Sequence, residues 1–278
     1  MLLTLFKVII FGIVEGITEW LPISSTGHMI LLNAWMPLPF DDAFLTVFLI
    51  VIQLGAVLAV LCLFWRYICP LEWEVKGMNR KKKLLIRKDM IHLWLKIGVA
   101  CLPAVMLELL WGDVLEERFY HPVSVAMALI IVGMLFIVVE SVRRRKMPVI
   151  VMTEDITWQM AFFIGVCQAA AAAFPGTSRS GATIIGALLL GIDRSVAAAF
   201  TFYLAIPVMF GASLVKIVEF SVVWSMDQIV YTCIGMVTAF IVSVMVIRFL
   251  MDYVRQHDFK IFGWYRILLG MIVLLYFI

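Results

Sequence analysis

The sequence contains little charge for its length. Only 15% of its 278 residues are Asp, Glu, Lys or Arg, whereas 64% are hydrophobic. This composition excludes an ordinary water-soluble globule and is typical of a polytopic membrane protein. The net charge of +3 arises mainly from basic residues in short segments that flank apolar stretches. That placement gives no reason to expect nucleic-acid binding.

Cysteine is also scarce, and no two cysteines form a CxxC pair. The five are Cys62, Cys69, Cys101, Cys167 and Cys233. Their scatter argues against a disulfide framework or a thiolate metal centre. We interpret them as small residues packed in apolar surroundings.

Long apolar runs dominate what remains, and six are long enough to span a bilayer. These predicted spans cover residues 43–65, 93–111, 122–140, 195–217, 228–250 and 261–278. Two other apolar segments, 2–40 and 157–191, are each broken in the middle by Pro, Gly and hydroxyl residues. Such breaks interrupt a helix, and irregular backbone at membrane depth survives only inside protein or beside a water-filled cavity. We therefore expect two re-entrant helix–loop–helix hairpins.

The two broken segments resemble each other. A shift of 153 residues places Glu15 on Gln168, Pro22 on Pro175 and Ser25 on Ser178, with Arg179 then as an insertion. The sequence thus predicts one integral-membrane domain over residues 1–278, built from inverted repeats of about 1–145 and 146–278. Inverted repeats with broken helices place a polar site between the copies, near the middle of the membrane.

Loop charge predicts the orientation. Basic residues gather on one predicted side, which the positive-inside rule assigns to the cytoplasm, with both termini outside. They are Arg66, Lys76, Arg80, Lys81, Lys82, Lys83, Arg87, Lys88, Arg143, Arg144, Arg145, Lys146, Arg194, Arg248, Arg255 and Lys260.

Two carboxylates lie one helical turn apart in the first broken segment. Glu15 and Glu19 share a helix face and point toward the turn that follows. Such a pair can hold a hard divalent cation, Mg²⁺ or Ca²⁺, together with phosphate oxygens and water. Alternatively, one carboxylate acts as a general base, or the pair only makes helix-to-helix hydrogen bonds.

Ser25 and His28 follow this pair. A serine becomes a nucleophile when a base takes its proton, and Glu19 or His28 could serve. Histidine itself and a water molecule remain open as nucleophiles, and neighbouring hydroxyls could simply cap the next helix.

Arg179 lies in the second break. A guanidinium binds phosphate oxygens through two parallel hydrogen bonds, and hydroxyls and amides at a helix start add further donors. The alternative role is an Arg–Glu pair that joins the two hairpins. The expected phosphate-binding residues are Ser24, Thr26, Gly27, Ser178, Arg179, Ser180 and Thr183.

These motifs resemble those of the integral-membrane undecaprenyl-pyrophosphate phosphatases of the bacitracin-resistance type. The resemblance rests on residues 15–19 (EGITE), 21–28 (LPISSTGH) and 175–183 (PGTSRSGAT). It implies a multi-pass enzyme of the bacterial plasma membrane that converts undecaprenyl pyrophosphate to undecaprenyl phosphate, with a divalent cation and a site open to the outer face. It also implies recycling of the lipid carrier for peptidoglycan synthesis.

One departure concerns Leu49, where the family often has an acidic residue before its Gln-Leu-Gly stretch. The competing interpretation is a secondary transporter or lipid flippase, because inverted repeats with broken helices are typical of transporters. The expected partners are a polyprenyl pyrophosphate lipid and the bilayer. The oligomeric state stays open, with a homodimer among the options.

Overall fold

The computed structural model describes residues 1–76, 81–143, 146–219 and 224–277, and these are mostly helical. The first half contains α1 (Leu2–Thr18), α2 (Ser25–Trp35), α3 (Asp42–Ile68), α4 (Lys88–Phe119) and α5 (Pro122–Arg143). The second half contains the 3₁₀ helix η1 (Thr153–Asp155), α6 (Trp158–Ala173), α7 (Arg179–Leu189), α8 (Arg194–Glu219), α9 (Met226–Val254) and α10 (Lys260–Phe277).

Six helices within these described ranges are long and apolar enough to cross a membrane. They are α3, α4, α5, α8, α9 and α10, and each contains most or all of one span predicted from the sequence. The protein is therefore an all-α polytopic membrane protein, as predicted.

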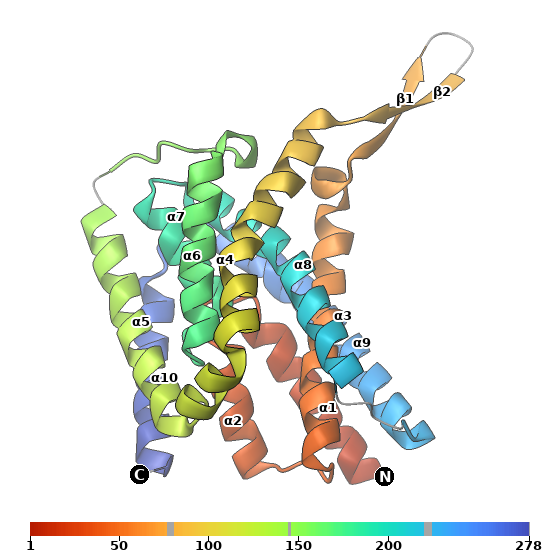
Figure 1. The fold of residues 1–278 in the computed structure, drawn as a ribbon, viewed down its shortest axis with the longest axis vertical. Helices are drawn as coiled ribbons and strands as arrows, with labels where there is room; N and C mark the ends of the chain where they lie inside the picture. The colour runs from red at the N-terminus through yellow and green to blue at the C-terminus, as the bar shows by residue number, and fades with distance from the viewer. Residues whose placement is uncertain (77–80, 144–145, 220–223, 278) are drawn as a thin grey trace.

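A small β-hairpin interrupts this pattern between α3 and α4. Strands β1 (Leu71–Lys76) and β2 (Lys81–Ile86) pair antiparallel, with Leu71 opposite Ile86. A charged loop was predicted for this region, so the hairpin is a difference from the prediction. Figure 1 shows it extending beyond the helices at one end of the molecule.

Two pairs of short helices enter from opposite ends. Figure 1 shows α1 and α2 in the half that holds both termini, and α6 and α7 toward the half that carries the β-hairpin. The turns that join each pair contact one another inside the molecule, since Arg179 after the second turn reaches Glu19 before the first. This arrangement supports re-entrant hairpins, which remain a prediction with respect to the membrane.

The order of helices supports the predicted inverted repeat. Each half runs as two short helices followed by three long ones. The packing follows the same relation, because α1 contacts α9 and α6 contacts α4, the fourth helix of the other half. The repeat boundaries at about 145 and 146 stay a prediction.

Both short-helix turns end in the same local structure. Ser24 and Ser178 have φ of 75° and 68°, the only positive values at non-glycine positions in the described chain. Each side chain caps the next helix, accepting from the amide of Gly27 or Gly181. Ser24, rather than Ser25, therefore occupies the position in the first turn that Ser178 occupies in the second. The alignment predicted between the two broken segments is off by one residue at this serine.

Helix α10 lies directly against α5. A Cβ on Gly133 would lie 2.7 Å from the carbonyl oxygen of Gly263, and a Cβ on Gly263 would lie equally close to that of Gly133. The two backbones can approach this closely only because both residues lack side chains. This contact holds α10 close against α5, and Arg266 of α10 is fully buried.

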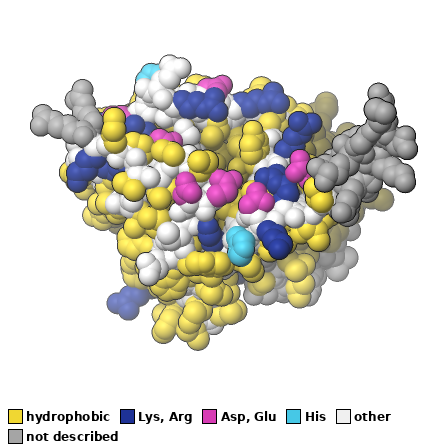
Figure 2. All heavy atoms as spheres, turned by 90° about the horizontal axis from the view of Figure 1, so that it is seen from above, with side chains coloured by type: hydrophobic (Ala, Val, Ile, Leu, Met, Phe, Trp, Pro, Cys, Tyr) yellow, Lys and Arg dark blue, Asp and Glu magenta, His cyan; other side chains and the backbone are white. Residues whose placement is uncertain are grey.

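The end with the β-hairpin carries much of the charge. Figure 2, which looks onto this end, shows Lys and Arg side chains among the loops, mixed with acidic side chains. Of the basic residues assigned to this side, Arg80, Arg144 and Arg145 lie outside the described residues. The assignment of this end to the cytoplasm stays a prediction.

Candidate active site

Glu19 joins the two turns. Its Oε1 accepts a hydrogen bond from Nη2 of Arg179 at 2.9 Å, and its Oε2 accepts from Oγ of Ser25, also at 2.9 Å. The Glu19 side chain is 9% exposed and that of Arg179 is 14% exposed. A buried carboxylate thus connects a serine of one helix pair with an arginine of the other, so that a hydroxyl, a base and a cation meet at one point.

The position of these groups follows from the local sequence. Glu19 ends α1, because the chain turns away at Leu21 and Pro22. Ser25 and Arg179 each occupy the first residue of the following short helix, α2 or α7. Side chains at two helix starts therefore converge on a carboxylate at a helix end.

Two hydroxyls of α7 extend this network. Ser180 Oγ lies 3.1 Å from Ser178 Oγ and donates to the backbone oxygen of Glu19 at 3.3 Å. Thr183 is fully buried, and its Oγ1 lies 2.9 Å from Oγ1 of Thr201 on α8. Thr201 also accepts a hydrogen bond at its carbonyl from Nη1 of Arg179, so α8 fixes the other end of the guanidinium.

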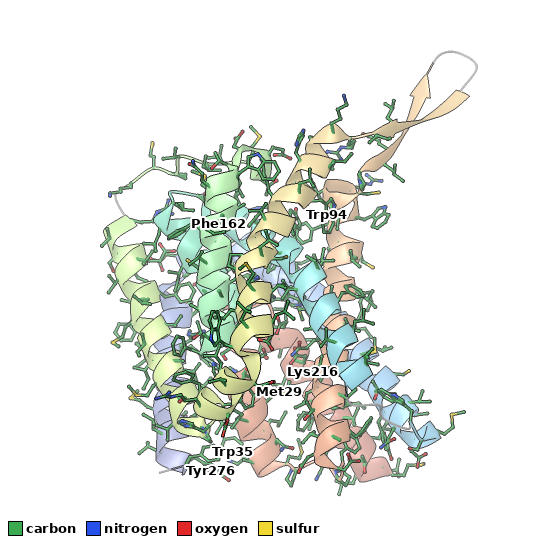
Figure 3. All side chains as sticks on the ribbon, viewed as in Figure 1. Met29, Trp35, Trp94, Phe162, Lys216 and Tyr276 are labelled. Atoms are coloured by element: carbon green, nitrogen blue, oxygen red, sulfur yellow. The ribbon has the colours of Figure 1, made fainter. Side chains whose placement is uncertain are left out.

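A cavity of about 460 Å³ reaches this network. Ser25, Thr26 and Glu15 line one part of it, and helices α2, α3, α4 and α6 supply most of the remaining wall. Figure 3 shows two of its lining residues, Met29 and Lys216, in the half of the molecule that holds both termini. The cavity therefore extends from the site toward the end opposite the β-hairpin.

Glu15 lies where the cavity meets the Glu19 network. It is 1% exposed, its Oε1 has no hydrogen-bond partner, and it interacts electrostatically with Glu19. Asn33 also lines the cavity and carries a buried oxygen without a partner. Buried polar atoms without partners are costly, so their presence here indicates a place for a bound polar group.

His28 has a different environment from the one expected of a base for Ser25. Its Nδ1 lies 2.7 Å from the carbonyl oxygen of Ser24, and its Nε2 lies 2.7 Å from Oη of Tyr265. Because a carbonyl only accepts, Nδ1 carries the proton and Nε2 can accept from Tyr265. Both ring nitrogens are thus engaged, and the serine hydroxyl bonds to Glu19 instead.

The remaining predicted phosphate-binding groups lie near the same turns. Thr26 lines the cavity beside Ser25. The hydroxyls of Ser24 and Ser178 and the amide of Gly27 take part in helix capping. Each serine hydroxyl satisfies one of the first amides of the helix that follows it, and so fixes where α2 or α7 begins.

Sequence reasoning did not assign a role to Arg266. This fully buried side chain donates to carbonyls of both turns, and its neighbour Tyr265 contacts His28. The signal for it was present, since an arginine inside a membrane span needs polar partners. The sequence did not indicate that those partners would be backbone carbonyls.

Comparison with known proteins extends over almost the whole chain. A family model described as bacitracin resistance protein BacA matches residues 8–272. An undecaprenyl-diphosphatase of Desulfitobacterium hafniense is 53% identical over 276 residues, covering 99% of this chain and 97% of that protein. Undecaprenyl-diphosphatase 1 of Clostridium acetobutylicum is 49% identical over 274 residues, with coverage of 99% and 97%. An undecaprenyl-diphosphatase of Enterococcus faecalis is 48% identical over 271 residues, with coverage of 98% and 96%.

Proposed function

The chain belongs to the family of bacitracin resistance protein BacA, and on this premise we propose its activity and how its residues perform it. It is an undecaprenyl-diphosphatase, a membrane hydrolase that removes the terminal phosphate of undecaprenyl pyrophosphate. The product, undecaprenyl phosphate, returns as a lipid carrier for cell-wall synthesis. Removing the terminal phosphate also removes the group that bacitracin sequesters, so resistance follows from the reaction.

One observation carries the mechanism: Glu19 binds the Ser25 hydroxyl with one oxygen and Arg179 with the other. We assign the nucleophile to Ser25 and the general base to Glu19. Ser25 Oγ attacks the terminal phosphorus, its proton passes to Glu19, and the bond from that phosphorus to the bridging oxygen breaks. Undecaprenyl phosphate leaves with that oxygen, and water then hydrolyses the phosphoserine to release inorganic phosphate.

Arg179 is the phosphate clamp in this scheme. Transition states of phosphoryl transfer spread charge over the peripheral oxygens, so a cation with two parallel donors stabilises them. The Glu19–Arg179 pair opens when substrate binds, and Arg179 then turns toward the phosphate. Glu19 is left with the serine proton as its partner.

Glu15 and Glu19 would hold a divalent cation. The orphaned Oε1 of Glu15 and the oxygen-only donor set fit a hard cation such as Mg²⁺ or Ca²⁺. The described residues contain no group of three or more His, Cys, Asp or Glu side chains arranged for a metal, so phosphate oxygens and water would complete the coordination. When bound, the cation would neutralise phosphate charge.

The site faces the outer surface of the plasma membrane in this proposal. The cavity leads toward the end of the termini, away from the end whose loops carry most of the basic residues of the sequence. With the basic loops in the cytoplasm, the cavity opens outward. All the groups named come from one chain, so the chemistry does not require a homodimer.

Phosphate release from a short prenyl pyrophosphate tests this function directly. We expect detergent-purified protein to release inorganic phosphate and to lose that activity with excess chelator. A protein that binds the lipid without releasing phosphate would support the transporter alternative instead.

A further inference from the structure

We infer that Arg266 is a positioning residue, which holds the two catalytic turns in register while the substrate separates Glu19 from Arg179. Its Nη1 donates to the carbonyl of Pro22 in the first turn at 3.2 Å. Its Nη2 donates to the carbonyls of Gly176 and Thr177 in the second turn at 2.8 and 2.9 Å. One side chain of α10 therefore connects both turns.

The dipoles of these three backbone carbonyls stabilise the positive charge of Arg266. Among the described residues, no carboxylate forms an ion pair with it, and it is fully buried. A planar guanidinium can direct donors to several carbonyls at once, which a single ammonium group cannot do with the same geometry. One rigid group thus binds both turns and fixes how they lie relative to each other.

The bonded carbonyls lie close to the reacting groups in the chain. Pro22 stands between Glu19 and Ser25, and Thr177 precedes Arg179 by two residues. A shift of one turn against the other would therefore separate the serine and its base from the clamp. Misplacement of catalytic groups by about 1 Å can lower rates by about 10²-fold.

The direct link between the turns cannot keep this register during the reaction. In the resting structure, the Glu19–Arg179 ion pair at 2.9 Å joins them, beside one longer hydrogen bond of 3.3 Å from the Ser180 hydroxyl to the Glu19 carbonyl. That pair must open if Arg179 is to bind the phosphate, which rests on the function proposed above. The bonds from Arg266 involve no reacting side chain, so they persist when the pair opens.

Surrounding contacts leave the turns little room for another arrangement. A Cβ on Gly176 would lie 2.5 Å from the carbonyl oxygen of Val125, and one on Gly181 would lie 3.3 Å from Nη1 of Arg266. Tyr265 adds a second contact from α10, with its ring stacked on that of His28 at a centroid distance of 5.6 Å. Helix α10 therefore contacts the first helix pair at two places: Arg266 bonds to its turn, and Tyr265 contacts His28 near the start of α2.

Steady-state kinetics of Arg266→Met and Arg266→Lys test this role. Arg194→Lys is the matched control. Arg194 also donates two side-chain hydrogen bonds, both to the buried carboxylate of Glu140, but it bonds to neither turn. We expect kcat to fall about 10²-fold in Arg266→Met, with a much smaller change in KM. Arg266→Lys should recover about tenfold of that loss, and Arg194→Lys should keep kcat within about twofold of wild type.

The outcomes separate this inference from the proposed function. If wild-type protein releases no phosphate, the function fails. If wild type is active and folded Arg266→Met keeps its kcat, or if Arg194→Lys loses as much, the positioning role is wrong. Should Arg266→Met fail to fold, Arg266→Lys decides alone: normal kcat at an unchanged melting temperature overturns the inference, and a fall of about tenfold supports it.

Discussion

Replacing Arg179 with lysine removes the clamp while keeping its charge. In the structure the two terminal nitrogens of Arg179 have separate partners, Glu19 Oε1 at 2.9 Å and the carbonyl of Thr201 at 3.1 Å. Lysine has a single amino group. It cannot reproduce this fork, and it cannot bind two phosphate oxygens through two parallel hydrogen bonds as a planar guanidinium does.

The size of the effect follows from the loss of one preorganised donor in a buried site. Such losses typically lower kcat by about 10² to 10³-fold, or about 2.7–4 kcal/mol of transition-state stabilisation. Arg179 is mostly buried, so little solvent screening reduces this value. We expect Arg179→Lys to lose about 10²-fold in kcat, with a smaller change in KM.

The assay is phosphate release by purified protein over a range of prenyl pyrophosphate concentrations. Arg194→Lys controls for the general effect of shortening an arginine that pairs with a buried carboxylate, Glu140. Turnover near the wild-type value in folded Arg179→Lys would refute the bidentate clamp.

Three further predictions concern the turn, the metal and the topology. Ser24→Ala and Ser24→Gly both remove the helix cap, but glycine also relieves the strain of the positive φ at this position. Ser24→Gly should therefore be the more stable variant, by about 1 kcal/mol. The reverse order of melting temperatures would contradict this account. Excess EDTA should abolish turnover and Mg²⁺ or Ca²⁺ should restore it, whereas full activity with metal shown absent would exclude a cation at Glu15. In a cysteine-free background, an impermeant thiol reagent applied to intact cells should label a cysteine at Asp41 and not one at Lys146; the opposite pattern would falsify the orientation.

The spans and the breaks were predictable because each rests on a strong local signal. Long apolar runs specify membrane helices, and Pro22 and Gly176 interrupt short ones. An Arg–Glu pair between the two hairpins was one of the alternatives considered, because ionisable groups at membrane depth need partners, and the structure gives Glu19 as the partner of Arg179.

Other features depended on tertiary contacts that no local pattern encodes. His28 bonds to Tyr265, which lies 237 residues away, and this contact removes the histidine from Ser25. Arg266 finds its partners in backbone carbonyls, which every residue carries and no sequence distinguishes. The alignment of the two turns needed the positive φ of Ser24, because adjacent serines look alike in sequence.

Turnover of Ser25→Ala tests the central assignment most directly. The control is Ser243→Ala, which removes another hydroxyl that bonds to α1, at the carbonyl of Gly16, away from the cavity. If Ser25 is the nucleophile and Glu19 its base, phosphate release should fall to background in Ser25→Ala and stay near wild type in Ser243→Ala. Near-normal turnover in Ser25→Ala would contradict the covalent scheme and assign the attack to water.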